Sequence, residues 1–328
     1  MRVVITGGAG FLGGRLAHAM LERGTLTDSR GEVREIGEIV LVDIAVPATH
    51  DDPRVRAIQG SLDDPAFVAR VITPDTDAVF HLAAVVSGQA EADFDVGMRV
   101  NVDAMRHVLE RCRACRQPPK FVFASSLAVF GGALPDPVPD DAAVTPQTSY
   151  GTQKAIGELL VNDMSRKGMI DGRALRLPTI VVRPGKPNRA ASSFASGIIR
   201  EPLSGVDAPC PVAPATRMWV QSPRAVVSNL LVGHEAGADA LPAFRAINVP
   251  GIDIAVGDMV TALRSVAGDA VAARVLWRYD PVIDRIVSTW PARFEARVGR
   301  ALGMRADEDF ESIVRDYITR DQAPSTSA

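Results

Sequence analysis

RVVITGGAGFLGGRLAHAMLERG, residues 2–24, is the stretch that decides the fold of this chain. It starts with the branched apolar run Val3, Val4 and Ile5, which is typical of a buried strand, and it ends in an amphipathic helical pattern. Between the two lies a glycine turn with the spacing G-x-x-G-x-x-G. Such glycines let the backbone turn tightly, approach a pyrophosphate and pack the helix on the strand. The start of the helix then offers free N–H groups to the phosphates. This order predicts nucleotide binding, with a purely structural turn as the alternative.

The next 160 residues alternate between apolar strands and helices. Strands are expected in GEIVLVDIA (37–45), VRAIQG (55–60), DAVFHLAAVVS (77–87), KFVFASS (120–126) and RALRLPTIVVRPG (173–185), where the last ends at Arg183 and Pro184. Helices are expected from Asp64 and Pro65, over 95–116 and from about Pro146. Nearly continuous apolar strands are typical of parallel sheets covered on both faces. We therefore predict an α/β protein with a Rossmann-type, doubly wound parallel sheet and a smaller C-terminal α/β lobe that binds substrate.

This pattern also suggests a division of the chain. Residues 1–180 are expected to form mainly the nucleotide-binding domain, and residues 181–320 mainly the substrate lobe. A strand near 245–250 would return to the large sheet. Helices are expected at 223–236, from about 257, at 292–302 and at 307–319, and residues 321–328 are expected to be a flexible tail. Residues 25–38 are expected to be a polar insertion.

Composition narrows the possible partners. The 328 residues carry a formal net charge of −3 without a long run of one sign, which argues against nucleic acid or an anionic membrane as the main partner. No apolar run approaches the ~20 residues of a membrane span, and the chain starts with a core strand rather than a signal-type segment. We expect a cytoplasmic protein. Cys112 and Cys115 form a C-x-x-C pair without a second ligand pair, so we expect reduced thiols and no metal site.

The strongest catalytic pattern is Tyr150 with Lys154, which share one helix face at a spacing of four residues. Tyrosine is a poor base at its ordinary pKa of about 10. A neighbouring ammonium, together with a positive nicotinamide ring, would favour the phenolate. A serine at the end of the preceding strand, Ser125 or Ser126, could hold the substrate oxygen beside the phenol, and the lysine could bond the ribose of the cofactor. The alternative for Y-x-x-x-K alone is a surface pair.

Asp43 ends the second strand, where an acidic side chain can accept both ribose hydroxyls and would repel a 2′-phosphate. This residue favours NAD over NADP, and its alternative role is that of a helix cap or turn residue.

Several segments together resemble the extended short-chain dehydrogenase/reductase family, which includes nucleotide-sugar epimerases and dehydratases. The segments are TGGAGFLG, the strand ending at Asp43, HLAA, FASSLAVFG and YGTQK. The resemblance implies NAD as cofactor and Ser126, Tyr150 and Lys154 as the catalytic residues. It implies cofactor contacts at Gly7, Gly10, Phe11, Leu12, Gly13, Asp43, Ser61, Leu62, Leu82, Ala83, Ala84, Asn101, Tyr150, Lys154 and Pro178, with Asn101 supporting a strand end. Two departures are Phe130 in place of a usual tyrosine and Ser61 in place of a common aspartate, which leaves the adenine contacts less defined.

Within that family, LPTIVVRPGKPNRAASSFASGIIREPLSG and RMWVQSPRAVVSNLL resemble the D-erythronate dehydrogenases. This resemblance implies NAD-dependent oxidation of the carbon-2 hydroxyl of D-erythronate, a four-carbon sugar acid, to 2-oxotetronate, in sugar-acid catabolism. A carboxylate substrate favours a guanidinium partner, and Arg183 is the leading candidate; Lys186 and Arg189 fit solvated surface charges better. Arg217 and Trp219 could close the pocket or pack the smaller lobe. The predicted substrate residues are Ser87, Ser125, Ser126, Thr179, Arg183 and Ser192.

Two other functions compete with this prediction. A nucleotide-sugar epimerase is compatible with the same residue types, whereas a dehydratase commonly needs an acidic pair that the segment Ser126-Leu127-Ala128 lacks. A protein that senses NAD without turnover would typically lose Tyr150 or Lys154. The family resemblance further implies a homodimer formed through the helices at 101–116 and 150–166.

Overall fold

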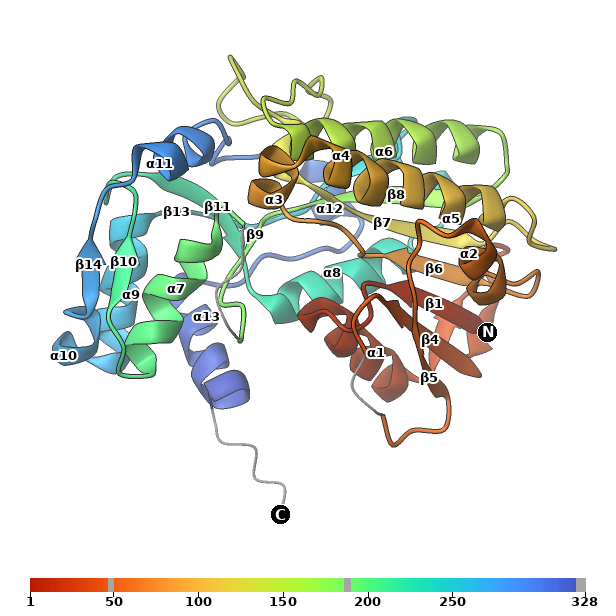
Figure 1. Ribbon diagram of the computed structural model, residues 1–328, viewed down its shortest axis with the longest axis horizontal. Helices are drawn as coiled ribbons and strands as arrows, with labels where there is room; N and C mark the ends of the chain where they lie inside the picture. The colour runs from red at the N-terminus through yellow and green to blue at the C-terminus, as the bar shows by residue number, and fades with distance from the viewer. Residues whose placement is uncertain (47–49, 186–189, 323–328) are drawn as a thin grey trace.

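A seven-stranded sheet forms the larger part of the molecule. The computed structural model describes residues 1–46, 50–185 and 190–322. The strand order is β12-β8-β7-β6-β1-β4-β5, and every neighbouring pair is parallel (Figure 1). The predicted doubly wound parallel sheet is therefore confirmed. The strands are β1 (Arg2–Thr6), β4 (Glu38–Asp43), β5 (Val55–Gln59), β6 (Ala78–His81), β7 (Lys120–Ser126), β8 (Asp171–Leu177) and β12 (Ala246–Asn248).

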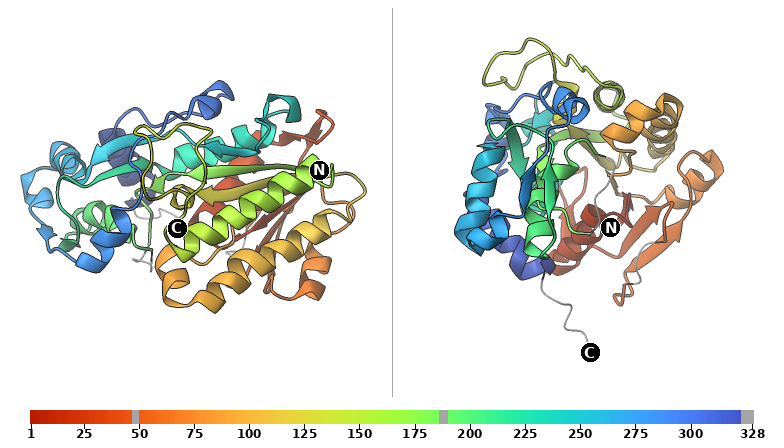
Figure 2. Two further views of the ribbon diagram at one scale, coloured as in Figure 1. Left: turned by 90° about the horizontal axis from the view of Figure 1, so that it is seen from above. Right: turned by 60° about the vertical axis from the view of Figure 1, so that its left-hand side comes forward.

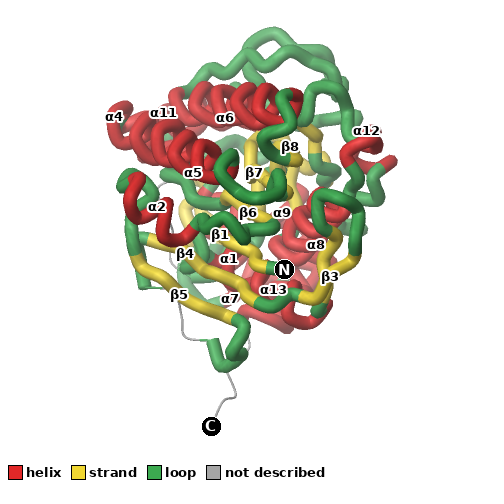
Figure 3. Tube along the Cα trace, turned by 90° about the vertical axis from the view of Figure 1, so that its right-hand side faces the viewer, coloured by secondary structure: helices red, strands yellow, loops and turns green. Residues whose placement is uncertain are grey.

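Helices cover both faces of this sheet, as the side view in Figure 3 shows. Because side chains alternate along a strand, Val3 and Ile5 face one apolar cluster and Val4 faces another. The first cluster includes α1 (Phe11–Arg23) and α8 (Pro223–Glu235). The second includes α2 (Pro65–Val71), α5 (Ala104–Cys112) and α6 (Ser149–Arg166). The strands are apolar over nearly their whole length because helices cover the sheet on both faces.

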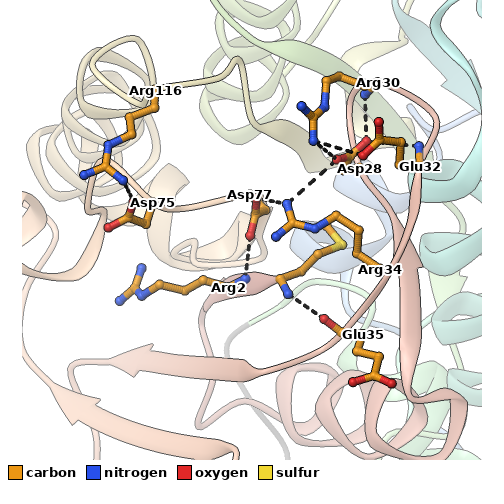
Figure 4. Close-up of polar contacts among 10 residues, drawn as sticks. Arg2, Asp28, Arg30, Glu32, Arg34, Glu35, Asp75, Asp77 and Arg116 are labelled. Atoms are coloured by element: carbon orange, nitrogen blue, oxygen red, sulfur yellow. Dashed lines mark hydrogen bonds and ion pairs between the residues drawn. The ribbon is translucent and has the colours of Figure 1, made fainter.

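The insertion at residues 25–38 forms a hairpin at the amino ends of the strands. Its strands are β2 (Thr25–Thr27) and β3 (Val33–Glu35). Ion pairs fasten it to the sheet: the Arg34 guanidinium lies 3.0 Å from Asp77, whose other oxygen accepts from the backbone N–H of Arg2 at 2.7 Å (Figure 4). The hairpin therefore lies at the edge of the sheet opposite to the carboxyl ends of the strands.

The smaller lobe lies beyond the carboxyl ends of the strands (Figures 1 and 2). It contains the mixed sheet β13-β11-β9 and the parallel pair β10-β14, packed around one apolar cluster. Its strands are β9 (Thr179–Ile180), β10 (Ala208–Cys210), β11 (Arg217–Gln221), β13 (Ile252–Ala255) and β14 (Val275–Trp277). Its helices are α7 (Ser193–Leu203), α9 (Val256–Ala267), α10 (Asp269–Ala272), α11 (Pro281–Val287) and α13 (Phe310–Tyr317).

Several predicted elements differ from the structure, and the strand expected over 77–87 already ends at His81. The sixth strand of the large sheet ends at Leu177 rather than at Arg183, because Pro178 interrupts the chain and β9 joins the smaller sheet. The helix expected over 95–116 is divided into α4 (Phe94–Gly97), a π-helical turn η1 (Met98–Asp103) and α5. The helix expected at 292–302 is only α12 (Arg297–Ala301), because Phe294 forms a bridge with Val138 instead.

The remaining short elements complete the chain. They are α3 (Ser87–Ala92), the 3-10 turns η2 (Leu127–Val129) and η3 (Ala238–Ala240), and the π-helical turn η4 (Ile318–Gln322). Asp321 and Gln322, expected to begin the tail, belong to η4, and Asp321 pairs with Arg15. Among the helices of the described residues, none combines the length and the apolar character needed to cross a bilayer.

Candidate active site

A cavity opens where the strands of the large sheet end against the smaller lobe. Residues from β7, α6, the β8–β9 connection and β11 all line it, although they are far apart in the sequence. Most of the predicted site residues meet there. They are Phe11, Leu12, Leu82, Ala84, Ser87, Ser125, Ser126, Tyr150, Lys154, Pro178, Thr179, Arg183 and Ser192.

The glycine turn beside this cavity has the shape that a dinucleotide requires. Gly7 has a φ of 72°, and a Cβ there would lie 2.9 Å from the backbone nitrogen of Ala83. A Cβ on Gly13 would lie 2.5 Å from the carbonyl oxygen of Gly7. Gly10 is the N-cap of α1, and no side chain occupies its cap. The turn thus leaves free N–H groups at the helix start, which fits a pyrophosphate.

Asp43 lies next to the same turn, at the end of β4. One oxygen of its carboxylate accepts from the N–H of Ala9 at 3.0 Å, and the other accepts from the N–H of Ala45 at 3.1 Å. The neighbouring strand β5 is tied to this end by the bond from the Gly60 N–H to the Asp43 carbonyl. A carboxylate in this position fits the ribose role predicted from the sequence.

Ser61 and Leu62 follow β5, one strand further along. The Ser61 hydroxyl donates to Asp63 at 2.5 Å, so the carboxylate absent at position 61 is present two residues later. Leu62 is buried, and its carbonyl oxygen lies 3.2 Å from a ring nitrogen of His107. The polar group that this segment offers at the sheet edge is therefore the pair of Ser61 and Asp63.

Asn101 is buried and acts as a support. Its side chain accepts from the N–H of Val85 at 2.9 Å and donates to the Val85 carbonyl at 3.2 Å and to Gln153 at 2.7 Å. These bonds fix the chain directly after β6, where Leu82, Ala83 and Ala84 lie. Asn101 does not line the cavity itself.

Tyr150 lies in the first turn of α6, whose N-cap is Thr148. The Thr148 hydroxyl accepts from the N–H of Gly151 at 3.1 Å, which fixes the helix start and with it the direction of the phenol. Burial raises the pKa of Tyr150 to about 12, while a hydrogen bond with Ser126 and the positive charge of Arg183 act in the opposite direction. The positive charge of Arg183 thus favours the phenolate, an effect on Tyr150 that the sequence pattern did not predict.

Lys154 lies one turn later and is 3 % exposed. Its ammonium donates to the carbonyl of Ala124 at 2.8 Å and lies 5.6 Å from the centre of the Tyr150 ring. Burial lowers the pKa of Lys154 to about 7, and the carboxylate of Glu158 acts against this shift. The ammonium is thus placed between the strand end and the phenol.

Ser125 and Ser126 have different surroundings, although both line the cavity. The Ser126 Oγ accepts from the N–H of Ala128 at 3.2 Å, and the Ser126 hydroxyl acts to lower the pKa of Tyr150. The Ser125 hydroxyl instead donates at 2.6 Å to Glu158, which pairs with the buried Arg176. Because the Ser125 hydroxyl donates its proton to this buried pair, that proton is not available to a substrate oxygen.

Arg183 is held by the smaller lobe. Its N–H donates to the Ser196 hydroxyl at 3.0 Å, its carbonyl accepts from Arg200 at 2.7 Å, and its guanidinium reaches the Ser192 hydroxyl at 3.5 Å. Burial and the charge of Arg200 lower the pKa of Arg183. A partly buried guanidinium in a cavity is well suited to a carboxylate. Lys186 and Arg189 lie outside the described residues.

Ser87 and Thr179 complete the predicted polar lining. The Ser87 hydroxyl accepts from the N–H of Ala191 at 3.3 Å, which ties α3 to the smaller lobe. Thr179 lies in β9. Arg217 and Trp219 also line the cavity, and the Trp219 indole donates to the Val249 carbonyl at 3.1 Å.

An apolar wall from the smaller lobe was not foreseen. Its residues are Met218, Val287, Trp290 and Pro291. Val287 is the last residue of α11, a helix that begins about 130 residues after Tyr150 along the chain. Trp290 and Pro291 follow this helix. No motif marks them, so only the packing of the two parts of the chain reveals them.

The cysteines lie away from the cavity lining. Cys112, Cys115 and Cys210 are free thiols. Burial raises the pKa of all three, which disfavours the reactive thiolate.

The comparisons with known proteins place this geometry in a family. The model of the NAD dependent epimerase/dehydratase family matches residues 3–220. The chain belongs to this family. The family resemblance predicted from the glycine turn and the Tyr150–Lys154 pair is thus confirmed, and the sheet described above is the family's nucleotide-binding fold.

The similar proteins include two dehydrogenases and a solved structure that is named as an epimerase. D-erythronate dehydrogenase from Cupriavidus necator is 56% identical over 97% of this chain and 98% of its own length. D-erythronate dehydrogenase from Haemophilus influenzae is 45% identical over 98% of this chain and 100% of its own length. A solved structure of a nucleoside-diphosphate-sugar epimerase from Agrobacterium tumefaciens is 39% identical, with a TM-score of 0.91 over 100% of this chain and 96% of that one.

Proposed function

We propose that this protein is an NAD-dependent dehydrogenase that oxidises the carbon-2 hydroxyl of D-erythronate to 2-oxotetronate. The observation that carries this proposal is the full-length identity with two D-erythronate dehydrogenases, at 56% and 45%. The cavity supports it, because Ser126, Tyr150 and Lys154 share that cavity with Arg183, which fits a carboxylate.

The proposed chemistry assigns one task to each side chain. NAD, when bound, accepts the hydride from carbon 2. Tyr150 removes the proton of the carbon-2 hydroxyl, and the ammonium of Lys154 beside it favours the phenolate. Ser126, whose hydroxyl acts to lower the pKa of the phenol, holds the substrate oxygen next to it. Arg183 grips the carboxylate and so fixes the distance between carbon 2 and the base.

The polar groups around this centre would bind the remaining hydroxyls. Ser87, Thr179 and Ser192 line the same cavity and come from three different elements or loops. Cofactor contacts are proposed at the glycine turn, at Asp43 and at the residues that the sequence assigns to the groove.

A nucleotide-sugar epimerase is the second candidate. The Agrobacterium structure favours it by its name and its TM-score of 0.91. The dehydrogenases share more identical residues with this chain over nearly its whole length, and apolar side chains of the smaller lobe line part of the cavity. For these two reasons the dehydrogenase is the better supported function.

The decisive experiment is a spectrophotometric screen of four-carbon acids and their epimers with NAD and with NADP. We expect stoichiometric reduction of NAD by D-erythronate. Tyr150→Phe should abolish turnover and leave NAD binding, measured by fluorescence titration, nearly intact. Interconversion of nucleotide sugars without net NAD reduction would overturn the proposal in favour of the epimerase, as would full activity of the Tyr150 variant.

A second experiment compares two arginine variants and tests which arginine holds the substrate carboxylate. Arg183→Gln should raise KM for D-erythronate by about tenfold to a hundredfold, because a charge-assisted hydrogen bond is lost. Arg217→Gln is the matched control, since Arg217 lines the same cavity but is exposed and paired with Asp253 at 2.7 Å. A larger rise in KM for the Arg217 variant would transfer this role to Arg217.

We also propose a homodimer and a cytoplasmic enzyme of sugar-acid catabolism. Helices α5 and α6 lie side by side on one face (Figure 2), and Leu159 of α6 and Phe94 of α4 are exposed there. Three free cysteines are compatible with a reducing compartment.

A further inference from the structure

The chain between α11 and α12 borders two hollows of the molecule. Trp290 and Pro291 of the segment 288–292 line the active-site cavity, and together with Arg217 they also line a second hollow. That second hollow is bordered by the loop that carries Gly132, Leu134 and Asp136. In Figure 1, α11 lies at the upper edge of the smaller lobe. The 288–292 segment thus contributes side chains to both hollows and forms a wall of the active-site cavity.

This wall is fixed at both of its ends. At the α11 end, the Asp280 carboxylate caps the helix by accepting from the N–H of Val282 at 2.9 Å, and the N–H of Trp290 donates to the Val287 carbonyl at 3.1 Å. At the other end, Phe294 forms a bridge with Val138. The Phe294 ring packs 5.6 Å from the rings of Phe130 and of Trp219. An anchored segment can define the size of a pocket.

The Trp290 side chain is held by packing alone. Its indole nitrogen is buried and has no hydrogen-bond partner within the described parts of the chain. The ring packs against the apolar cluster of the smaller lobe. The volume of the ring, rather than a polar contact, is therefore what it contributes to the cavity.

The proposed function fixes which way a substrate must extend. Arg183 would hold the carboxylate and Tyr150 would face carbon 2, while the cofactor would occupy the side lined by Phe11, Leu12 and Leu82. Carbons beyond carbon 2 would then meet the remaining apolar lining, Met218, Val287, Trp290 and Pro291. A longer sugar acid would meet the 288–292 segment.

We propose that Trp290 is the residue that limits the chain length of the sugar-acid substrate, by closing the cavity against the second hollow. This inference rests on the proposed function. Replacing the indole by a methyl group would join the two hollows and admit acids with five or six carbons. The Arg217 and Asp253 side chains, which also border the second hollow, would offer polar contacts to their extra hydroxyls.

The test compares Trp290→Ala with Trp290→Phe and with Trp277→Ala. Trp277 is a matched control, because it is 44% exposed in the same lobe and lines neither hollow. For each protein, kcat/KM is measured with D-erythronate and with five- and six-carbon aldonates of the same configuration at carbons 2 and 3. The ratio between the four-carbon and the six-carbon acid should fall by about tenfold or more in Trp290→Ala, which is the discrimination that one methylene in a tight pocket provides. It should stay within about twofold of the wild type in the two other variants, because the ring or the wall remains.

The same acids are also titrated calorimetrically onto each protein saturated with NADH, which cannot accept a hydride, so no acid is oxidised during the titration. This measurement does not require turnover, so it separates the two hypotheses. A changed ratio of Kd values for Trp290→Ala, without oxidation of any acid by the wild type, would overturn the proposed function and retain the wall. An unchanged ratio in both kcat/KM and Kd, in a variant with the wild-type circular dichroism spectrum, would overturn the inference.

Discussion

At the scale of single residues, Lys154 has the most definite effect on the stability of the folded protein. Its ammonium is enclosed, and burial lowers its pKa from 10.5 to about 7. Between these two values the unfolded chain binds more protons than the folded one, so by linkage the contribution of Lys154 to stability rises with pH. Below about pH 7 Lys154 is protonated in both the folded and the unfolded chain. The folded state then bears the full free-energy cost of burying the charged ammonium.

Lys154→Met should therefore stabilise the protein most at low pH. We expect the difference in Tm between the variant and the wild type to be largest near pH 6 and to shrink steadily toward about pH 10. Thermal unfolding in buffers of equal ionic strength measures this difference. Lys167→Met is the control, because Lys167 follows the same helix but is exposed and pairs with Asp163 at 3.8 Å. A difference in Tm that does not change with pH would contradict the stated burial of the ammonium.

The residues of the site differ in how far the sequence could predict them. Tyr150 and Lys154 follow from spacing, because a separation of four residues places both on one helix face in any protein. The bond between Ser125 and Glu158 could not be predicted, since it depends on Arg176, which comes from another strand and lies against the same carboxylate at 2.8 Å. Local pattern therefore identified the serines but did not distinguish their tasks.

At the scale of elements, the sequence predicted the strands and helices that depend on local residues alone. The strands of the large sheet follow from apolar runs, and α2 follows from its cap, since Asp64 accepts from the N–H of Ala66 at 2.8 Å. The errors arise where a distant partner decides. Phe294 leaves its helical pattern because Val138 pairs with it, and β9 leaves the large sheet because Val220 of β11 pairs with Thr179.

At the scale of the whole molecule, the site is a product of contact between the two parts of the chain. The larger part supplies Ser126, Tyr150 and Lys154, and the smaller lobe supplies Arg183 and the wall at Trp290. Neither part has the complete set of groups. The catalytic residues lie in local motifs and could therefore be predicted from the sequence. The wall at Trp290 depends on how the two parts of the chain pack, so it could not.

The outer face of α5 and α6 provides the last prediction, which concerns assembly. Leu159 is 55% exposed on α6, the helix that also carries Tyr150 on its inner face. A large apolar side chain exposed on a helix face is favourable once a partner covers it. If two copies pair through this face, Leu159→Asp would place a charge in the interface and would shift the protein toward monomers. Light scattering after size-exclusion chromatography should show about half the wild-type mass at equal concentration.

Val206→Asp is the control for this charge. Val206 is also 55% exposed but lies in the smaller lobe, after α7. This variant should keep the wild-type mass, because the proposed interface does not include it. A wild-type mass for both variants would place the contact elsewhere, whereas a monomeric wild type would remove the dimer from the proposal and leave the cavity intact. The two results are separable because every group assigned to the chemistry lies within one chain.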